Sequence, residues 1–177
     1  MRRIILKRIS IVLLAAVLMS TSATLGQTRR RSTPRPKAGS SATQKSTEAR
    51  TAGATRVADQ IKFLTKFIYL LGGVSSGIAA VDEAAKRNEA SPAVLQKNEQ
   101  SKATVKTSIQ GFRESLDKLE IDFRATPELQ PYYIKLAGVA SGAANAEQQA
   151  SANQFDAAGR SLLNVVNRLT DVLLAMR

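Results

Sequence analysis

The sequence predicts an all-α protein: an antiparallel four-helix bundle built from two similar helical hairpins, preceded by a signal peptide and a disordered basic linker. Three observations support this prediction. From residue 57 onward, apolar residues recur at spacings of three and four, with no sustained alternation of period two. A glycine-containing block occurs twice in this region. The excess of basic residues is confined to the first 56 residues.

The net charge of +12 is unevenly distributed along the chain. Residues 1–26 carry four basic residues and no acidic one, and residues 27–56 carry eight basic residues and one acidic residue. Residues 57–177 hold 14 basic and 13 acidic residues, so the expected bundle is close to neutral. A nucleic-acid-binding domain carries its basic patch on the fold, and this distribution therefore counts against nucleic acid as a partner.

Residues 1–26 have the pattern of a secretory signal peptide. Basic residues precede the apolar run Ile9–Met19, and small and polar residues follow it. We expect cleavage after Gly26, with Ala23 as the alternative site. The mature protein is then exported, to the periplasm or to the outside of the cell.

An uncleaved membrane anchor is the minority interpretation of the same segment. The 20 uncharged residues from Ile9 to Thr28 are long enough to span a bilayer, although Ser20–Thr24 is polar. Arg2 and Arg3 resemble the start of a twin-arginine export signal, so both general (Sec) and twin-arginine export are consistent with the sequence.

Residues 27–56 are rich in Arg, Ser, Thr and Pro and poor in apolar residues. Such a segment buries too little surface to offset the entropy of ordering, so we expect a disordered linker. It contains a cluster of basic residues, which are Arg29, Arg30, Arg31, Arg35 and Lys37. The cluster has the charge to tether the protein to an anionic membrane or cell-wall surface. A solvated linker is the alternative.

Residues 57–177 contain four apolar stripes, which predict hairpins over 57–124 and 127–177. The stripes run from Val57 to Ala85, from Val105 to Phe123, from Tyr132 to Ala150 and from Phe155 to Met176. Ser91-Pro92 and Thr126-Pro127 have the composition of helix starts, and Ser151–Gln154 resembles a capping box. The polar start of the second helix, around Asn98 and Lys102, is expected to extend beyond the core.

The repeated block reads LGGVSSGIAA from residue 71 and LAGVASGAA from residue 136. It places Gly73 and Gly77 in the first expected helix and Gly138 and Gly142 in the third. Glycine inside a helix costs about 1 kcal/mol relative to alanine, so these positions need a reason. Pairs of small residues four apart let two helices approach closely. We expect the first and third helices to pack together through these glycines.

Two alternatives remain for the glycines. They form the interface of a homodimer or bind a partner helix, or the first helix inserts into a membrane. The uncharged run Phe67–Val81 has 15 residues, which is short for a span.

The composition excludes several functional classes. The chain has no Cys and no His, which removes disulfides, Cys/His zinc sites and nucleophiles that depend on a His base. Ser115 and Lys118 match a Ser-x-x-Lys motif but lack its companion motifs. Acidic residues around Glu114 and Asp117 lie on an expected solvated face. We therefore predict no catalytic residue, no metal site and no cofactor.

The function we expect is that of an exported, non-enzymatic helical-bundle protein that acts as an interaction or scaffold module at the bacterial envelope. Its partner is an unidentified protein or a second copy. The alternative is a carrier or sensor of a small apolar ligand held between the hairpins, where Ala143, Ala146 and Ala150 leave room. A membrane-active protein is a more remote alternative.

Overall fold

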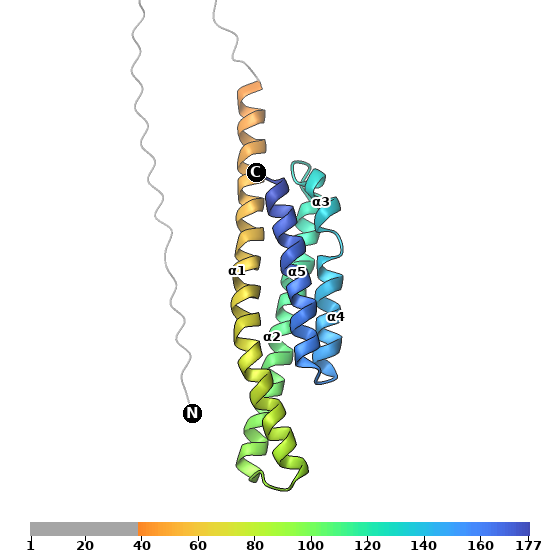
Figure 1. Ribbon diagram of the computed structural model, residues 1–177. Helices are drawn as coiled ribbons and strands as arrows, with labels where there is room; N and C mark the ends of the chain where they lie inside the picture. The colour runs from red at the N-terminus through yellow and green to blue at the C-terminus, as the bar shows by residue number, and fades with distance from the viewer. Residues whose placement is uncertain (1–38) are drawn as a thin grey trace, which may run out of the picture. The chain divides into compact units, whose positions relative to one another are not determined.

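A computed structural model describes residues 39–177, which are helical apart from short connections (Figure 1). The helices are α1 (Gly39–Lys86), α2 (Pro92–Ala125), α3 (Gln130–Leu136), α4 (Val139–Ser151) and α5 (Phe155–Ala175). The all-helical prediction is confirmed for these residues. The expected signal peptide and the basic cluster Arg29–Lys37 lie outside the described residues.

Helix α1 begins well before the predicted start at Val57. It has 48 residues and extends past α5 at both of its ends (Figure 1). The prediction of a disordered linker is therefore wrong for residues 39–56. Residues 27–38 of that linker lie outside the described part of the chain.

Packing explains why this polar segment is helical. The hydroxyl groups of Thr47, Thr51 and Thr55 each donate a hydrogen bond to the carbonyl oxygen four residues earlier, which a helix accommodates but which does not stabilise it. Gly53 is buried, and a Cβ there would lie 2.8 Å from Leu129 Cδ2 and 3.0 Å from Met176 Cε. The last turns before Val57 therefore pack against the ends of the other helices, and this packing stabilises a segment of weak apolar character.

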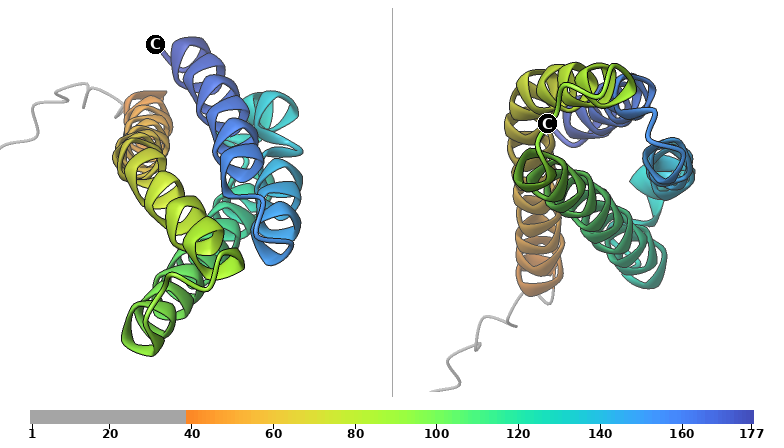
Figure 2. Two further views of the ribbon diagram at one scale, coloured as in Figure 1. Left: turned by 60° about the horizontal axis from the view of Figure 1, so that its bottom comes forward. Right: turned by 90° about the horizontal axis from the view of Figure 1, so that it is seen from below.

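The four long helices form a ring in which α1 packs against α2 and α5, and α4 packs against the same two helices (Figure 2). Helices α1 and α4 are therefore diagonal to each other. The short helix α3 lies against α2 and α5. Ion pairs join neighbouring helices, among them Arg56 with Asp122 at 2.7 Å, and Arg113 with Glu147 at 2.6 Å.

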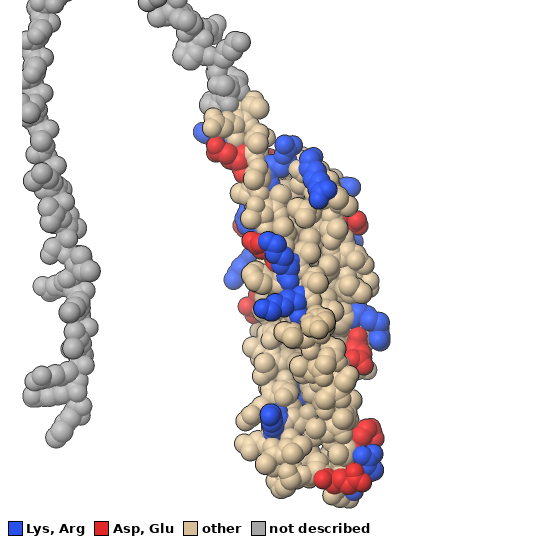
Figure 3. Space-filling view, turned by 60° about the vertical axis from the view of Figure 1, so that its left-hand side comes forward, with Lys and Arg blue, Asp and Glu red and all other residues tan. Residues whose placement is uncertain are grey.

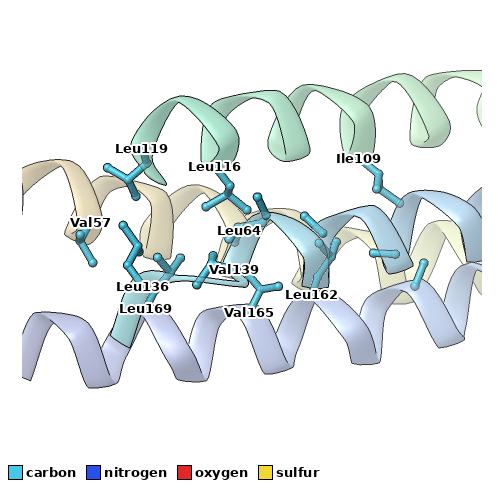
Figure 4. Packing of buried hydrophobic residues seen from close by; sticks show 14 of the residues in the cluster. Val57, Leu64, Ile109, Leu116, Leu119, Leu136, Val139, Leu162, Val165 and Leu169 are labelled. Carbon is cyan, nitrogen blue, oxygen red and sulfur yellow. The ribbon is translucent and has the colours of Figure 1, made fainter. Parts of the chain in front are cut away.

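The core is a continuous cluster of hydrophobic side chains from all five helices (Figure 4). On α1 the buried aliphatic residues recur every seven positions, at Val57, Leu64, Leu71 and Ile78. A repeat of seven keeps one face of a helix against its neighbours over many turns. The predicted stripe is confirmed at these positions. It is wrong at Val74, which is 40% exposed.

The expected third helix is broken in two at Gly138. This residue has φ +89°, a left-handed conformation that favours glycine, and it precedes α4. Glu120 of α2 accepts a hydrogen bond from the backbone N–H of Ala140 at 2.8 Å, and Arg168 of α5 donates one to the Gly138 carbonyl at 3.2 Å. Neighbouring helices thus satisfy backbone groups that the break leaves free. The prediction of two similar hairpins is wrong here, since α1 is continuous at Gly73.

The hairpin of α1 and α2 contains a partly buried polar cluster where we expected an overhang. Asp82 of α1 accepts hydrogen bonds from Asn98 Nδ2 at 2.7 Å and from Lys102 Nζ at 2.8 Å. Lys102 also pairs with Glu99 at 2.9 Å, and its side chain is only 11% exposed. These hydrogen bonds raise the pKa of Lys102, the bond to Asp82 having the larger effect and the bond to Glu99 the next. The cluster fixes how α1 and α2 align along the hairpin.

Candidate interaction surface

The outward face of α1 is the largest departure from the usual pattern of a surface helix. Large hydrophobic side chains on it face solvent: Tyr69 is 83% exposed, Phe63 60% and Leu70 54%. The 18-residue window within Thr43–Lys86 has a mean hydropathy of 1.5, enough in length and composition for a membrane span, yet only 22% of it is buried. Exposed apolar surfaces of this kind are typical of sites where another molecule binds.

Gly73 and Gly77 lie on this outward face. A Cβ added at Gly72, Gly73 or Gly77 would meet no atom within 4 Å. The expected packing of Gly73 and Gly77 against Gly138 and Gly142 is therefore wrong, because α1 and α4 are diagonal. The alternative, that Gly73 and Gly77 serve an interface with another molecule, remains a proposal.

The two glycines of the second block have other roles. Gly138 supplies the left-handed residue before α4. Gly142 lets α4 approach α5, since a Cβ there would lie 2.8 Å from Val165 Cγ2. The copy of the block that begins at residue 136 therefore serves packing within the protein, whereas the glycines of the copy that begins at residue 71 lie on an exposed face.

An apolar groove runs beside the outward face, between α1 and α2. Its upper part has a volume of about 410 Å³ and is lined on α1 by Phe67, Leu70 and Val74. A second part of about 300 Å³ continues along the hairpin past Gly77 and Val81. Polar side chains of α2, among them Lys97, form the opposite wall. The groove widens the apolar surface on the α2 side of α1.

Two grooves lie on the other side of α1, between α1 and α5. One has a volume of about 290 Å³ and is mainly apolar. The other is more polar, has a volume of about 420 Å³, and includes Ser75, Asp156 and Arg160 in its lining. The hydroxyl of Ser75, which is buried, donates a hydrogen bond to Asp156 Oδ1 at 2.7 Å. This bond joins α1 to the start of α5, where a carboxylate is favourable. We therefore assign it a structural role.

Charged pairs flank the outward face of α1 at both ends. Asp59 pairs with Lys62 at 3.2 Å, and Glu83 pairs with Lys86 at 2.6 Å. The hydrogen bond with Lys86 lowers the pKa of Glu83, so this carboxylate is ionised at neutral pH. Viewed over α1, the surface is mostly free of charge between the central blue side chains and the end of the hairpin (Figure 3).

The expected ligand space near Ala143, Ala146 and Ala150 is closed. All three residues have no exposed surface, and they pack in the core. The grooves described above on residues 43–177 are lined by other residues. Mainly apolar grooves lie within the first hairpin and between α1 and α5, and none of them is lined by these alanines. The support that we named for a ligand between the hairpins is therefore lost.

The motif residues that we set aside on sequence grounds have structural partners. Ser115 Oγ donates a hydrogen bond to the Gly111 carbonyl at 2.9 Å. Asp117 pairs with Arg113 at 2.9 Å, and Glu120 caps α4 as described above. Within residues 43–177, no group of three or more Asp or Glu side chains is placed to hold a metal ion.

Comparison with known proteins adds no relative. No family model matches the chain, and searches of curated proteins and of solved structures found no significant match. The site therefore has to be interpreted from its own geometry: a helical bundle with an outward apolar face on its longest helix.

Sequence reasoning missed two features of the structure. Phe63, Tyr69 and Leu70 lie outside the predicted stripe, and their own spacing predicts a second face on the same helix. The ion pair between Asp82 and the largely buried Lys102 was also missed. The signal for it was the heptad spacing of Lys102, Ile109 and Leu116, which places Lys102 in the same register as buried residues further along α2.

Proposed function

We propose that this chain is a non-enzymatic helical-bundle protein of the bacterial envelope, which acts as an interaction or scaffold module and presents α1 to its partner. One observation carries the proposal: the outward face of α1 is apolar and exposed, while the core-facing residues of the same helix are fully packed. The envelope location rests on the signal-peptide pattern in residues 1–26.

The chemistry of this face favours a protein partner over a substrate. Charged pairs lie at the two ends of the face, and its centre consists of aromatic, aliphatic and glycine residues together with Lys66. Protein interfaces combine an apolar centre rich in aromatic residues with a charged rim. The arrangement offers shape and apolar area, which are the properties of a binding surface.

Site-specific photo-crosslinking tests this proposal with a matched control. Tyr69 on α1 and Ile134 on α3 are large side chains with nearly equal exposure, 83% and 82%. A photo-reactive phenylalanine analogue is placed at one of these positions at a time, in cells that express the full chain. We expect a discrete protein adduct from position 69 and none from position 134. Equal labelling, or no adduct from position 69, contradicts the proposal.

A carrier of a small apolar ligand is the second candidate function. It is favoured by the groove of about 410 Å³ beside Phe67 and Val74, which is large enough for a small ligand. Titration with a long-chain alcohol, as a probe, compares the wild-type protein with Val74→Asp. Saturable binding of one molecule that the substitution abolishes supports a carrier. Binding that the substitution leaves unchanged removes the groove as the site.

A membrane-active protein is the remote alternative, and α1 has the composition for it. The uncharged run within α1 has 15 residues, and a helix needs about 20 to cross the hydrocarbon core. Vesicle flotation distinguishes this alternative: cofloating with uncharged phosphatidylcholine vesicles at high salt supports insertion, because apolar insertion does not depend on charge.

A further inference from the structure

The outward face of α1 has a regular seven-residue repeat whose residues lie outside the core of the chain's own bundle. Asp59, Lys66, Gly73, Ala80 and Arg87 recur every seven residues along it, and Arg87 directly follows the helix. Bulky residues occur before Gly73, and small residues occur after it. The two halves of the face therefore differ in both size and charge.

We propose that two copies of the protein pair through this face, with their α1 helices antiparallel about a twofold axis at Gly73. This inference rests on the proposed function and names a second copy as the partner. Antiparallel pairing about Gly73 brings each residue before it on one copy against a residue after it on the other copy, on the same side of the helix and at the same distance from Gly73 to within one residue. Gly73 then meets Gly73 of the second copy, and the absence of side chains there lets the helices approach closely.

The sizes of the paired residues are complementary under this symmetry. Each large side chain on one copy lies opposite a small one on the other, so the large side chains pack into the spaces that the small residues leave. The pairs are Leu70 with Gly77, Tyr69 with Ser76, Phe63 with Ala84, and Lys66 with Ala80. The monomer leaves room for such contacts, since nothing lies within 4 Å of a Cβ built at Gly73 or Gly77.

The charges at the ends of the face are complementary as well. The same symmetry places Lys62 opposite Glu83 and Asp59 opposite Arg87 of the second copy. Within one chain, Lys62 already pairs with Asp59, and Glu83 with Lys86. Pairing of two copies therefore joins these into a charge network at each end of the interface, which fixes the register of the two helices.

In a parallel pair of α1 helices, by contrast, each residue lies beside the same residue of the other copy. It brings Lys62 and Lys66 of one copy next to the same residues of the other, and it packs Tyr69 against Tyr69 while the glycines leave a gap. Like charges and a gap both weaken an interface. The observations therefore favour the antiparallel arrangement.

Cysteine crosslinking tests the position of the axis. The chain has no cysteine, so a single introduced thiol reports on one position. A disulfide needs Cα atoms about 4.4–6.8 Å apart, and only a residue on the axis comes that close to its own copy. We expect Gly73→Cys to form a disulfide-linked dimer under mild oxidation. Gly111→Cys is the matched control, because Gly111 is also helical, exposed and without neighbours within 4 Å.

Charge reversal tests the register. Lys62→Glu alone, and Glu83→Lys alone, each place like charges together twice in the dimer and should weaken it about three- to tenfold. The double variant restores opposite charges and should return the dissociation constant to near that of the wild type. Sedimentation equilibrium of the protein isolated from cells that express the full chain measures all four forms.

The outcomes separate this inference from the proposed function. A monomer at all concentrations, or equal oxidation of Gly73→Cys and Gly111→Cys, overturns self-pairing. If position 69 then still crosslinks to a different protein, the interaction module stands with another partner. Weakening by the single reversals without recovery in the double variant overturns the antiparallel register. If the protein is monomeric and inserts α1 into vesicles, both the self-pairing and the proposed interaction module are overturned.

Discussion

The ammonium group of Lys102 on α2 lies 2.8 Å from Oδ1 of Asp82 on α1. The Lys102 side chain is largely buried, and Asn98 donates to the same carboxylate oxygen at 2.7 Å. A buried charge of this kind adds little net stability, but removing one partner leaves the other poorly solvated. Its main effect is to fix one alignment of the two helices along the hairpin.

Lys102→Met is therefore expected to destabilise the protein by about 1–2 kcal/mol, since Asp82 keeps some access to water. The folded state raises the pKa of Lys102 above 10.5, so the folded protein holds this proton more tightly than the unfolded chain. The contribution is complete below the unfolded pKa and is lost as the pH rises through the folded one. Urea unfolding of both proteins, at neutral pH and above pH 10.5, should show a difference that shrinks at alkaline pH. A constant difference contradicts this.

Gly138→Ala is expected to cost about 1–2 kcal/mol, because alanine is strained at φ +89°. The new methyl group also comes within 3.0 Å of Arg168 Nη1. Gly111→Ala is the matched control: it lies in a regular part of α2 with open space, and it should stabilise the protein by up to about 1 kcal/mol. The measurement is the midpoint of urea denaturation, at an unchanged dependence of the unfolding free energy on urea. Equal effects of the substitutions at Gly138 and Gly111 would argue against the helix break at Gly138.

Gly77 and Gly142 occupy equivalent places in the repeated block but should respond oppositely to alanine. At Gly77 the added methyl group meets no atom, and about 1 kcal/mol of helix propensity is gained. At Gly142 it comes within 2.8 Å of the buried Val165, and overpacking costs about 1–3 kcal/mol. Thermal unfolding of both variants as monomers, at high dilution, measures the two effects. Melting temperatures that shift in the same direction for both variants would contradict the different packing of Gly77 and Gly142.

Glu120→Gln tests the cap on α4. The carboxylate of Glu120 accepts from the Ala140 amide in the first turn, where a negative charge is favourable by about 0.5–1 kcal/mol. We expect a loss of that size together with faster hydrogen exchange of the Ala140 amide. Glu128→Gln, at an exposed carboxylate outside the helices, is the control and should leave that amide unchanged.

The helical stripes could be predicted because they follow from burial alone. Val57 and Leu64 share a face at helical spacing, and tertiary packing follows that face. The start of α1 could not be predicted, since the stability of residues 39–56 comes from contacts such as Gly53 with Leu129, and these contacts require the folded bundle.

The break at Gly138 was hidden for a related reason. The sequence around Gly73 is nearly the same, yet only Gly138 has Glu120 and Arg168 beside it to satisfy the free backbone groups. The outward face of α1 was also obscured, because a helix that is apolar on most sides gives one mixed signal for its core and its exposed surface.

The position of Gly73 within α1 has a mechanical consequence for a paired molecule. A helix rises about 1.5 Å per residue, so the Gly39 ends of two antiparallel copies would lie on the order of 100 Å apart, pointing in opposite directions. Whatever precedes Gly39 would leave the pair at its two extremities. The pair would then work as a strut, transmitting tension or spacing between two separate attachment points.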